Sequence, residues 1–219
     1  MPEAASSASS LRPTLAGHAP AAVALSRRKR AFDIFVAGFA LLLFLPLMLV
    51  VGGAIWMESP GPVLFRQRRT GLQGRPFRIY KFRTMRVTED GDDLRQAARD
   101  DARVTPLGAI LRRMSLDELP QLINVVKGEM SIVGPRPHAL AHDQAWSSRV
   151  SGYAARFRAR PGLTGAAQVA GWRGEITDAE GLAQRVAADN AYIDGWSFAQ
   201  DLRLIARTLP LLFGDAKAF

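Results

Sequence analysis

Residues 34–57, IFVAGFALLLFLPLMLVVGGAIWM, decide the fold because they form a long apolar stretch without a charge. A helix of these 24 residues spans roughly 36 Å at about 1.5 Å per residue, enough for the hydrocarbon core of a bilayer. Pro46 lies in the middle, where it removes a backbone hydrogen bond and clashes with the preceding turn. The sequence therefore predicts a membrane helix that is broken at Pro46.

Both flanks of this stretch are basic. Residues 27–30 read RRKR, and residues 66–86 contain eight Lys or Arg and no acidic residue. Cytoplasmic flanks attract Lys and Arg, and a straight span cannot place both flanks on that side. A re-entrant helix over residues 27–58, which enters one leaflet and returns, satisfies both. An ordinary span with a proline kink is the alternative that charge leaves open.

Composition restricts the class of function. The net charge of +9 and the pI near 10.9 indicate an anionic partner, which is nucleic acid, acidic phospholipid or a phosphorylated substrate. The absence of cysteine excludes disulfides and thiolate metal sites. A membrane-anchored module that binds nucleic acid or anionic lipid is the competing class. Few aromatic residues interleave with the basic ones, so we expect no nucleic-acid partner.

The rest of the chain predicts a mostly helical α+β fold. Residues 1–26 are rich in Ala, Ser and Pro and predict a disordered tail, and residues 59–219 predict one domain. Two β-prone runs around Gly71-Leu72-Gln73-Gly74 predict a hairpin. Residues 88–103 are polar and predict a surface helix or loop. Amphipathic helices, some of them at the membrane surface, are expected over residues 105–114, 115–128, 178–195 and 198–213.

Two adjacent carboxylates stand in the segment SLDELPQLINVVKGEM, residues 115–130. Asp117 and Glu118 lie at the start of an expected helix, where the helix dipole favours their ionised forms. One ionised carboxylate beside a phosphate-binding surface can attack phosphorus, and a second can hold a metal or move a proton. The alternative is a capping box, in which Ser115 and Glu118 only satisfy backbone donors.

Three further residues suit phosphate binding. Arg136 stands between two prolines, which present its guanidinium rigidly enough for bidentate contact, although a tight turn with a solvated Arg is the alternative. In RPGLTG, Arg160 precedes a Pro-Gly turn and Thr164 follows it, so both can meet a phosphate or a base. His138 and His142 are four residues apart but lack a third ligand nearby, so we assign them no metal.

These motifs together resemble the bacterial sugar transferase family, the monotopic polyprenyl-phosphate phosphoglycosyl transferases, over roughly residues 27–214. No single motif suffices, but their order along the chain follows that of the family. The motifs are KRAFDI, SPGPVLFRQRRTG, PFRIYKFRTM, TPLGAILRRMSLDELPQLINVVKGEMSIVGPRP, RPGLTG and YIDGWSFAQDLRLIARTL.

The resemblance implies a two-step reaction at the cytoplasmic face of the bacterial inner membrane. A UDP-sugar and polyprenyl (undecaprenyl) phosphate would be the substrates, inner-membrane lipid would surround the helix, and Mg²⁺ would offset phosphate charge. Asp117 would be the nucleophile and metal ligand, and Glu118 the acid–base or orienting partner. Arg136 would clamp a phosphate, while Lys81 and Arg83 would support substrate binding.

The segments RPHALAHD and GAAQVAGWRGEIT are similar to those of glucose 1-phosphate transferases that start exopolysaccharide or capsule synthesis. UDP-glucose is therefore the expected donor, with galactose or an N-acetylated sugar as alternatives. The larger members have a multispanning N-terminal region, and this chain resembles a minimal catalytic form. Ala166 and Ala170 replace a usual Trp and Asn, and Leu45 replaces a frequent Ser before Pro46. The sequence leaves the oligomeric state open, a homodimer included.

Overall fold

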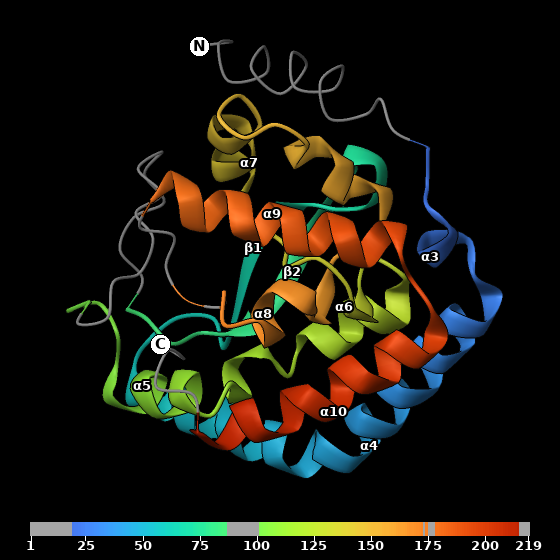
Figure 1. Cartoon of the computed structure of the whole chain (residues 1–219). Coiled ribbons are helices and arrows are strands. Elements are labelled where there is room, and N and C mark those ends of the chain that lie inside the picture. Colours follow the sequence, from blue (N-terminus) through green and yellow to red (C-terminus); the bar gives the residue numbers. More distant parts are fainter. Residues whose placement is uncertain (1–18, 87–100, 173, 175–177, 215–219) are drawn as a thin grey trace, which may run out of the picture.

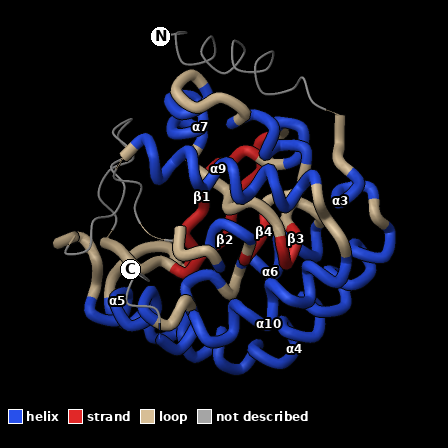
Figure 2. The backbone as a smooth tube through the Cα atoms, viewed as in Figure 1, coloured by secondary structure: helices blue, strands red, loops and turns tan. Residues whose placement is uncertain are grey.

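The structure, a computed structural model, describes residues 19–86, 101–172, 174 and 178–214. It is mostly helical, and its short strands lie among the helices near the centre of the molecule (Figures 1 and 2). The predicted α+β class is therefore confirmed. Most of the polar segment 88–103 and part of GWRGEIT lie outside the described residues.

Helices and strands alternate irregularly along the chain. The helices are α3 (Ala22–Leu25), α4 (Arg27–Glu58), α5 (Pro106–Arg113), α6 (Gln121–Lys127), α7 (Leu140–Ser147), α8 (Ala166–Val169), α9 (Ala179–Asp194) and α10 (Phe198–Gly214). The strands and short 3₁₀ helices are β1 (Leu64–Thr70), η1 (Leu72–Gly74), β2 (Pro76–Phe82), η2 (Leu116–Glu118), β3 (Ser131–Val133), η3 (Tyr153–Arg158) and β4 (Gly162–Thr164).

The longest helix, α4, carries the apolar stretch. It is the one helix in the described part of the chain that is long and apolar enough to cross a membrane. The prediction that the helix breaks at Pro46 is wrong, because α4 continues through this proline. A proline removes only one helical hydrogen bond, and bending relieves its clash with the previous turn. Figure 1 shows α4 bending where it passes beneath the molecule.

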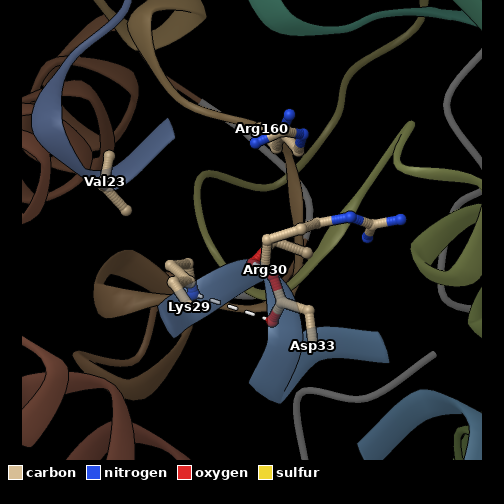
Figure 3. Close-up of a pocket in the computed structure, with 6 residues that line it drawn as sticks. Val23, Lys29, Arg30, Asp33 and Arg160 are labelled. Atoms are coloured by element: carbon tan, nitrogen blue, oxygen red, sulfur yellow. Dashed lines mark hydrogen bonds and ion pairs between the residues drawn. The ribbon is translucent and has the colours of Figure 1, made fainter. Parts of the chain in front are cut away.

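The N-terminal end of α4 is anchored to the rest of the domain by buried polar contacts. Lys29 donates to Asp201 of α10 at 2.9 Å. Asp33 accepts from the Ser131 hydroxyl at 2.7 Å and from the Ile132 amide at 3.1 Å. Figure 3 shows Lys29 beside Asp33, one turn apart at the start of α4. This end of the helix is therefore fixed to β3 and α10.

The C-terminal end of α4 is fixed to the same body by Arg83. Its buried guanidinium donates to the carbonyls of Ser59 and Pro60 at 2.6 and 2.9 Å, just beyond the last helical turn. Residues 42–47, between the two anchored ends, are exposed, with Leu42 75% accessible. The helix therefore leaves the domain and returns to it, with an apolar middle that no described part of the chain covers.

The predicted tail is ordered near its end. Residues 22–25 form α3, and Val23 joins the main core cluster. The Ala21 amide also donates to the Arg158 carbonyl at 2.9 Å. The prediction of disorder for residues 1–26 is therefore wrong for this last part, because the Val23 side chain packs in the core. Residues 1–18 lie outside the described ranges.

The predicted hairpin is confirmed. Strands β1 and β2 pair antiparallel from Leu64↔Phe82 to Thr70↔Pro76, with η1 in the connection. Asn124 of α6 acts as an additional partner for β2, because its side chain accepts from the Tyr80 amide at 3.0 Å and donates to the Arg78 carbonyl at 2.7 Å. These two bonds fix α6 against the strand that carries Lys81.

A second sheet was not predicted. Strands β3 and β4 pair in parallel, each over three residues. Such short strands carry no readable alternation, and their partners lie about thirty residues apart along the chain. The main core lies between this sheet, β2, α4, α6, α9 and α10, and its buried members include Ala37, Phe77, Ile79, Leu122, Val125, Met130, Ile132, Val133, Tyr192 and Leu204.

Candidate active site

The carboxylate pair lies on a sharp turn and a short 3₁₀ helix. Ser115 has a left-handed backbone conformation (φ 57°), which ends α5 abruptly. The chain then forms η2, and α6 begins after Pro120 and ends at Gly128, where φ is 85°. One helix was expected over residues 115–128, but the structure divides it in two. The division places Asp117 and Glu118 on η2, against β2.

Two cations converge on Glu118. Its Oε1 lies 2.7 Å from Lys81 Nζ and 2.8 Å from Arg136 Nη2. Lys81 also lies 3.6 Å from Asp117 Oδ2. The side chains come from β2, η2 and the loop after β3, which are far apart in the sequence. The structure therefore brings together four of the predicted site residues, Lys81, Asp117, Glu118 and Arg136.

The capping-box alternative is contradicted. The Ser115 side chain makes no capping hydrogen bond to η2. Glu118 directs its carboxylate to Lys81 and Arg136 and not to a backbone donor at the start of the helix. The pair is therefore part of a charged cluster and not a cap at the start of a helix.

The two carboxylates differ in their electrostatic environment. Burial raises the pKa of Asp117, Lys81 opposes this effect, and the Glu118 charge adds to it. Burial also acts to raise the pKa of Glu118, but Arg136 and Lys81 outweigh it and hold that pKa well below its ordinary value. Glu118 is thus the fixed anion of the pair. Asp117 is the more basic carboxylate, which suits a nucleophile, and Glu118 suits an orienting role better than proton transfer.

Arg112, which sequence analysis did not single out, acts on Asp117 through its charge. It lies at the end of α5, and its charge acts to lower the pKa of Asp117. An amphipathic helix with two adjacent arginines gives no sign of which one influences the carboxylates electrostatically. Only the turn at Ser115 brings the end of α5 back toward η2.

The loop that carries Arg136 follows a close crossing of two backbones. A side chain at Gly134 would collide with the Arg160 carbonyl, and one at Gly162 would collide with the Gly134 amide. Glycine is needed at both positions because the strands approach so closely. The crossing directs the chain from β3 into the loop, so that Arg136 reaches Glu118.

Three predicted substrate ligands lie elsewhere. Arg83 binds the carbonyls at the end of α4, as described above. Arg160 donates to the Gly128 and Ala24 carbonyls at 3.0 and 2.8 Å, and Figure 3 shows it beside a small cavity near Lys29 and Arg30. Thr164 contacts the Thr208 hydroxyl at 2.7 Å. The structure does not bring these three to the carboxylate pair, and their binding roles stay predictions.

The two histidines form part of an aromatic cluster. His138 is buried with Nδ1 2.7 Å from the Tyr153 hydroxyl, and His142 stacks on Trp146. The described residues contain no group of three or more His, Cys, Asp or Glu that could hold a metal. A preformed metal cage is therefore absent from the described part of the chain. A single carboxylate that shares a cation with substrate phosphates remains compatible, since Mg²⁺ is commonly held in that way.

Comparisons with known proteins show which family this chain is similar to. Residues 24–215 match the family model "Bacterial sugar transferase". A UDP-glucose:undecaprenyl-phosphate glucose-1-phosphate transferase of Caulobacter vibrioides is 54% identical over 197 residues, which cover 90% of this chain and 74% of that protein. An Escherichia coli protein of the same name is 48% identical over 87% of this chain and 41% of its own length. The exopolysaccharide production protein PSS of Rhizobium leguminosarum is 44% identical, over 87% and 98% of the two chains.

Proposed function

The chain belongs to the bacterial sugar transferase family, and from this we propose that it transfers glucose 1-phosphate from UDP-glucose to undecaprenyl phosphate and releases UMP. The observation that carries the proposal is the Asp117–Glu118 pair, with Asp117 buried and Glu118 half-buried, in contact with Lys81 and Arg136. Relatives of the same family carry this activity in their names. The reaction would be the first membrane step of exopolysaccharide or capsule synthesis.

In the first step Asp117 attacks the β-phosphorus of UDP-glucose. A bond forms between a carboxylate oxygen and that phosphorus, and the bond from phosphorus to the bridging oxygen breaks. UMP leaves with the electron pair, and glucose 1-phosphate stays on Asp117 as an acyl phosphate. Negative charge from the substrate phosphates gathers beside Asp117 in this step and needs cations nearby. Lys81 and Arg136 are close enough to supply them, because both contact the adjacent Glu118.

In the second step an oxygen of undecaprenyl phosphate attacks the same phosphorus. The bond to Asp117 breaks, the carboxylate is regenerated, and the lipid-linked diphosphate sugar leaves. No net proton transfer is needed when both nucleophiles, the Asp117 carboxylate and undecaprenyl phosphate, are ionised, which agrees with a Glu118 that stays ionised between two cations. Its work is to hold Lys81 and Arg136 in place.

Magnesium fits the site as a cation shared with the substrate. Asp117 would hold it together with oxygen atoms of the substrate diphosphate. The cation would offset negative charge on the diphosphate. Glu118 fits this role poorly because Lys81 and Arg136 already neutralise it.

We propose that α4 enters the cytoplasmic leaflet of the inner membrane and returns, so that the domain lies on the cytoplasmic face. The support is that both ends of α4 are fixed to one body while its apolar middle is exposed. Helix α5 exposes Ile110, and α10 exposes Leu202 and Leu209. Figure 1 shows α4, α5 and α10 along the same side of the molecule, which would face the lipid.

Cysteine labelling tests this topology, because the natural chain contains no cysteine. Ser9→Cys and Asp90→Cys lie on opposite sides of α4 in sequence. We expect a membrane-impermeant maleimide to label neither variant in intact cells and both in inverted membrane vesicles. The cysteine-free chain is the control for background labelling. Labelling of Ser9→Cys from the periplasm and of Asp90→Cys from the cytoplasm would show a straight span.

UMP release across a panel of UDP-sugars tests the donor. We expect the highest kcat/KM for UDP-glucose, then UDP-galactose, with the two N-acetylated donors lower. A site that hydrogen-bonds a sugar hydroxyl rejects an epimer by leaving a polar group unpaired, although Ala166 and Ala170 offer fewer side chains for such contacts. Detergent-extracted protein is assayed with undecaprenyl phosphate, and the same panel with Asp117→Asn gives the background. A preference for an N-acetylated donor would change the sugar but not the reaction class.

A further inference from the structure

The loop that presents Arg136 is held by its carbonyl groups. Its two prolines have no amide hydrogen to donate, so the carbonyls must fix the backbone. The first proline's carbonyl accepts from the Gly162 amide at 2.9 Å. The Arg136 carbonyl accepts from Arg156 Nη2 at 2.7 Å, and the second proline's carbonyl from Arg69 Nη1 at 3.3 Å. The shortest of these bonds holds Arg136 itself and comes from a side chain.

Arg156 is itself fixed on several sides. It is 3% exposed, and its Nε donates to Asp189 Oδ2 of α9 at 2.9 Å. Its Nη1 lies 3.1 Å from His138 Nδ1, and its guanidinium lies 5.1 Å from the centre of the Tyr153 ring. Figure 1 shows α9 crossing the molecule beside the segment between α7 and α8 that contains η3. Arg156 therefore links α9 rigidly to the Arg136 backbone.

Stability alone does not account for this arrangement. A buried ion pair such as Arg156–Asp189 adds little over apolar residues of similar size, because desolvation offsets the attraction. What an apolar side chain cannot supply is a donor for the Arg136 carbonyl. From that backbone position the Arg136 side chain reaches Glu118 at 2.8 Å.

We propose that Arg156, locked by Asp189, is a positioning residue that fixes the backbone of Arg136 and so aims its guanidinium at Glu118 and the substrate phosphate. This role rests on the proposed function. Arg156 has no direct contact with the carboxylate pair among the described interactions. Its effect on the reaction must therefore pass through Arg136.

A double-mutant cycle in kcat and KM for UDP-glucose tests the role. Arg136→Lys should lose most activity, because an ammonium cannot make two parallel bonds to a phosphate. Arg156→Lys keeps the charge but cannot reach both Asp189 and the Arg136 carbonyl. We expect it to lower kcat/KM by about 10- to 100-fold. In the Arg136→Lys background the same change should cost less than about threefold, because the two act as one unit.

Arg158→Lys is the matched control. Arg158 also lies in η3 and pairs with a carboxylate of α9, Asp194, at 2.7 Å, but on the surface. Its kcat/KM should stay within about twofold of the parent, since exposed pairs contribute little. Rates are expressed per folded molecule, with melting curves beside them, so that loss of folded protein is not counted as loss of rate.

Equal losses from Arg156→Lys in both backgrounds would overturn the positioning role. If Arg156→Lys does not fold, Asp189→Asn enters the same cycle, because it keeps an oxygen acceptor for Arg156 Nε while removing the charge. The same two outcomes then apply. Wild-type protein that releases no UMP from any donor would contradict the proposed function itself. Active wild type with independent losses would contradict only the role of Arg156.

Discussion

Replacing Asp117 by Asn is expected to abolish UMP release, with a loss of at least about 10³-fold in kcat. An amide oxygen is too weak a nucleophile to form the acyl phosphate. The side chain keeps its shape, so the packing around it persists. UMP release at saturating UDP-glucose and undecaprenyl phosphate is the measurement.

The folded protein should tolerate this change. Burial raises the pKa of Asp117, which means that the fold disfavours its charge. A neutral amide removes that cost, so the melting temperature should not fall. Asp194→Asn, at an exposed carboxylate, is the control and should keep full activity. Retention of more than a few per cent of activity by Asp117→Asn would show that the nucleophile is assigned wrongly.

Replacing Glu118 by Gln should lower kcat by about 10²-fold without unfolding the protein. Gln retains one oxygen acceptor but not the charge that holds Lys81 and Arg136 together. Lys81, which already lies 3.6 Å from Asp117, would then pair with it more strongly and mask the nucleophile. The same kinetic assay measures the loss.

The stability change separates Glu118 from Asp117. The two cations hold the pKa of Glu118 well below its ordinary value, so the fold favours its charge. Gln should therefore lower the melting temperature, in contrast to Asp117→Asn. Glu180→Gln, at a position in the first turn of α9, is the control. Near-normal kcat for Glu118→Gln would contradict the orienting role.

Local signals made much of the architecture predictable. The apolar stretch predicted the long helix α4, and a glycine-containing connection between two β-prone runs predicted the hairpin. Thr105 followed by Pro106 marked the start of α5, where the Thr105 hydroxyl accepts from the Gly108 amide. Each of these features depends on residues close together in the sequence. The carboxylate pair and Arg136 were found because each belongs to a compact motif.

The roles of the individual basic residues in residues 66–86 could not be predicted from the sequence. This stretch contains eight basic residues and no acidic one, so composition alone does not distinguish among them. Lys81 reaches the carboxylates, Arg83 binds the end of α4, and Arg69 donates to the loop after Arg136. Only tertiary packing decides which cation serves which purpose.

Long-range contacts account for the other omissions. The Arg156–Asp189 pair joins residues 33 positions apart, and neither residue stands in a recognisable motif. The parallel pairing of β3 and β4 likewise depends on the close backbone approach at Gly134 and Gly162, which no periodicity in the sequence indicates. The positive φ of Ser115 divides an expected helix, and a serine carries no strong signal for that conformation.

Covalent transfer through Asp117 is the central claim, and a carrier-free reaction tests it most directly. Wild-type protein is incubated with UDP-glucose and Mg²⁺ but without undecaprenyl phosphate, and the released nucleotide, the intact protein mass and the masses of its proteolytic peptides are measured. We predict a burst of UMP that approaches one equivalent and a mass gain of one hexose phosphate on the peptide containing Asp117, which the added carrier then removes as lipid product. Release of UDP, or no UMP and no modified protein until the carrier is added, would contradict the account.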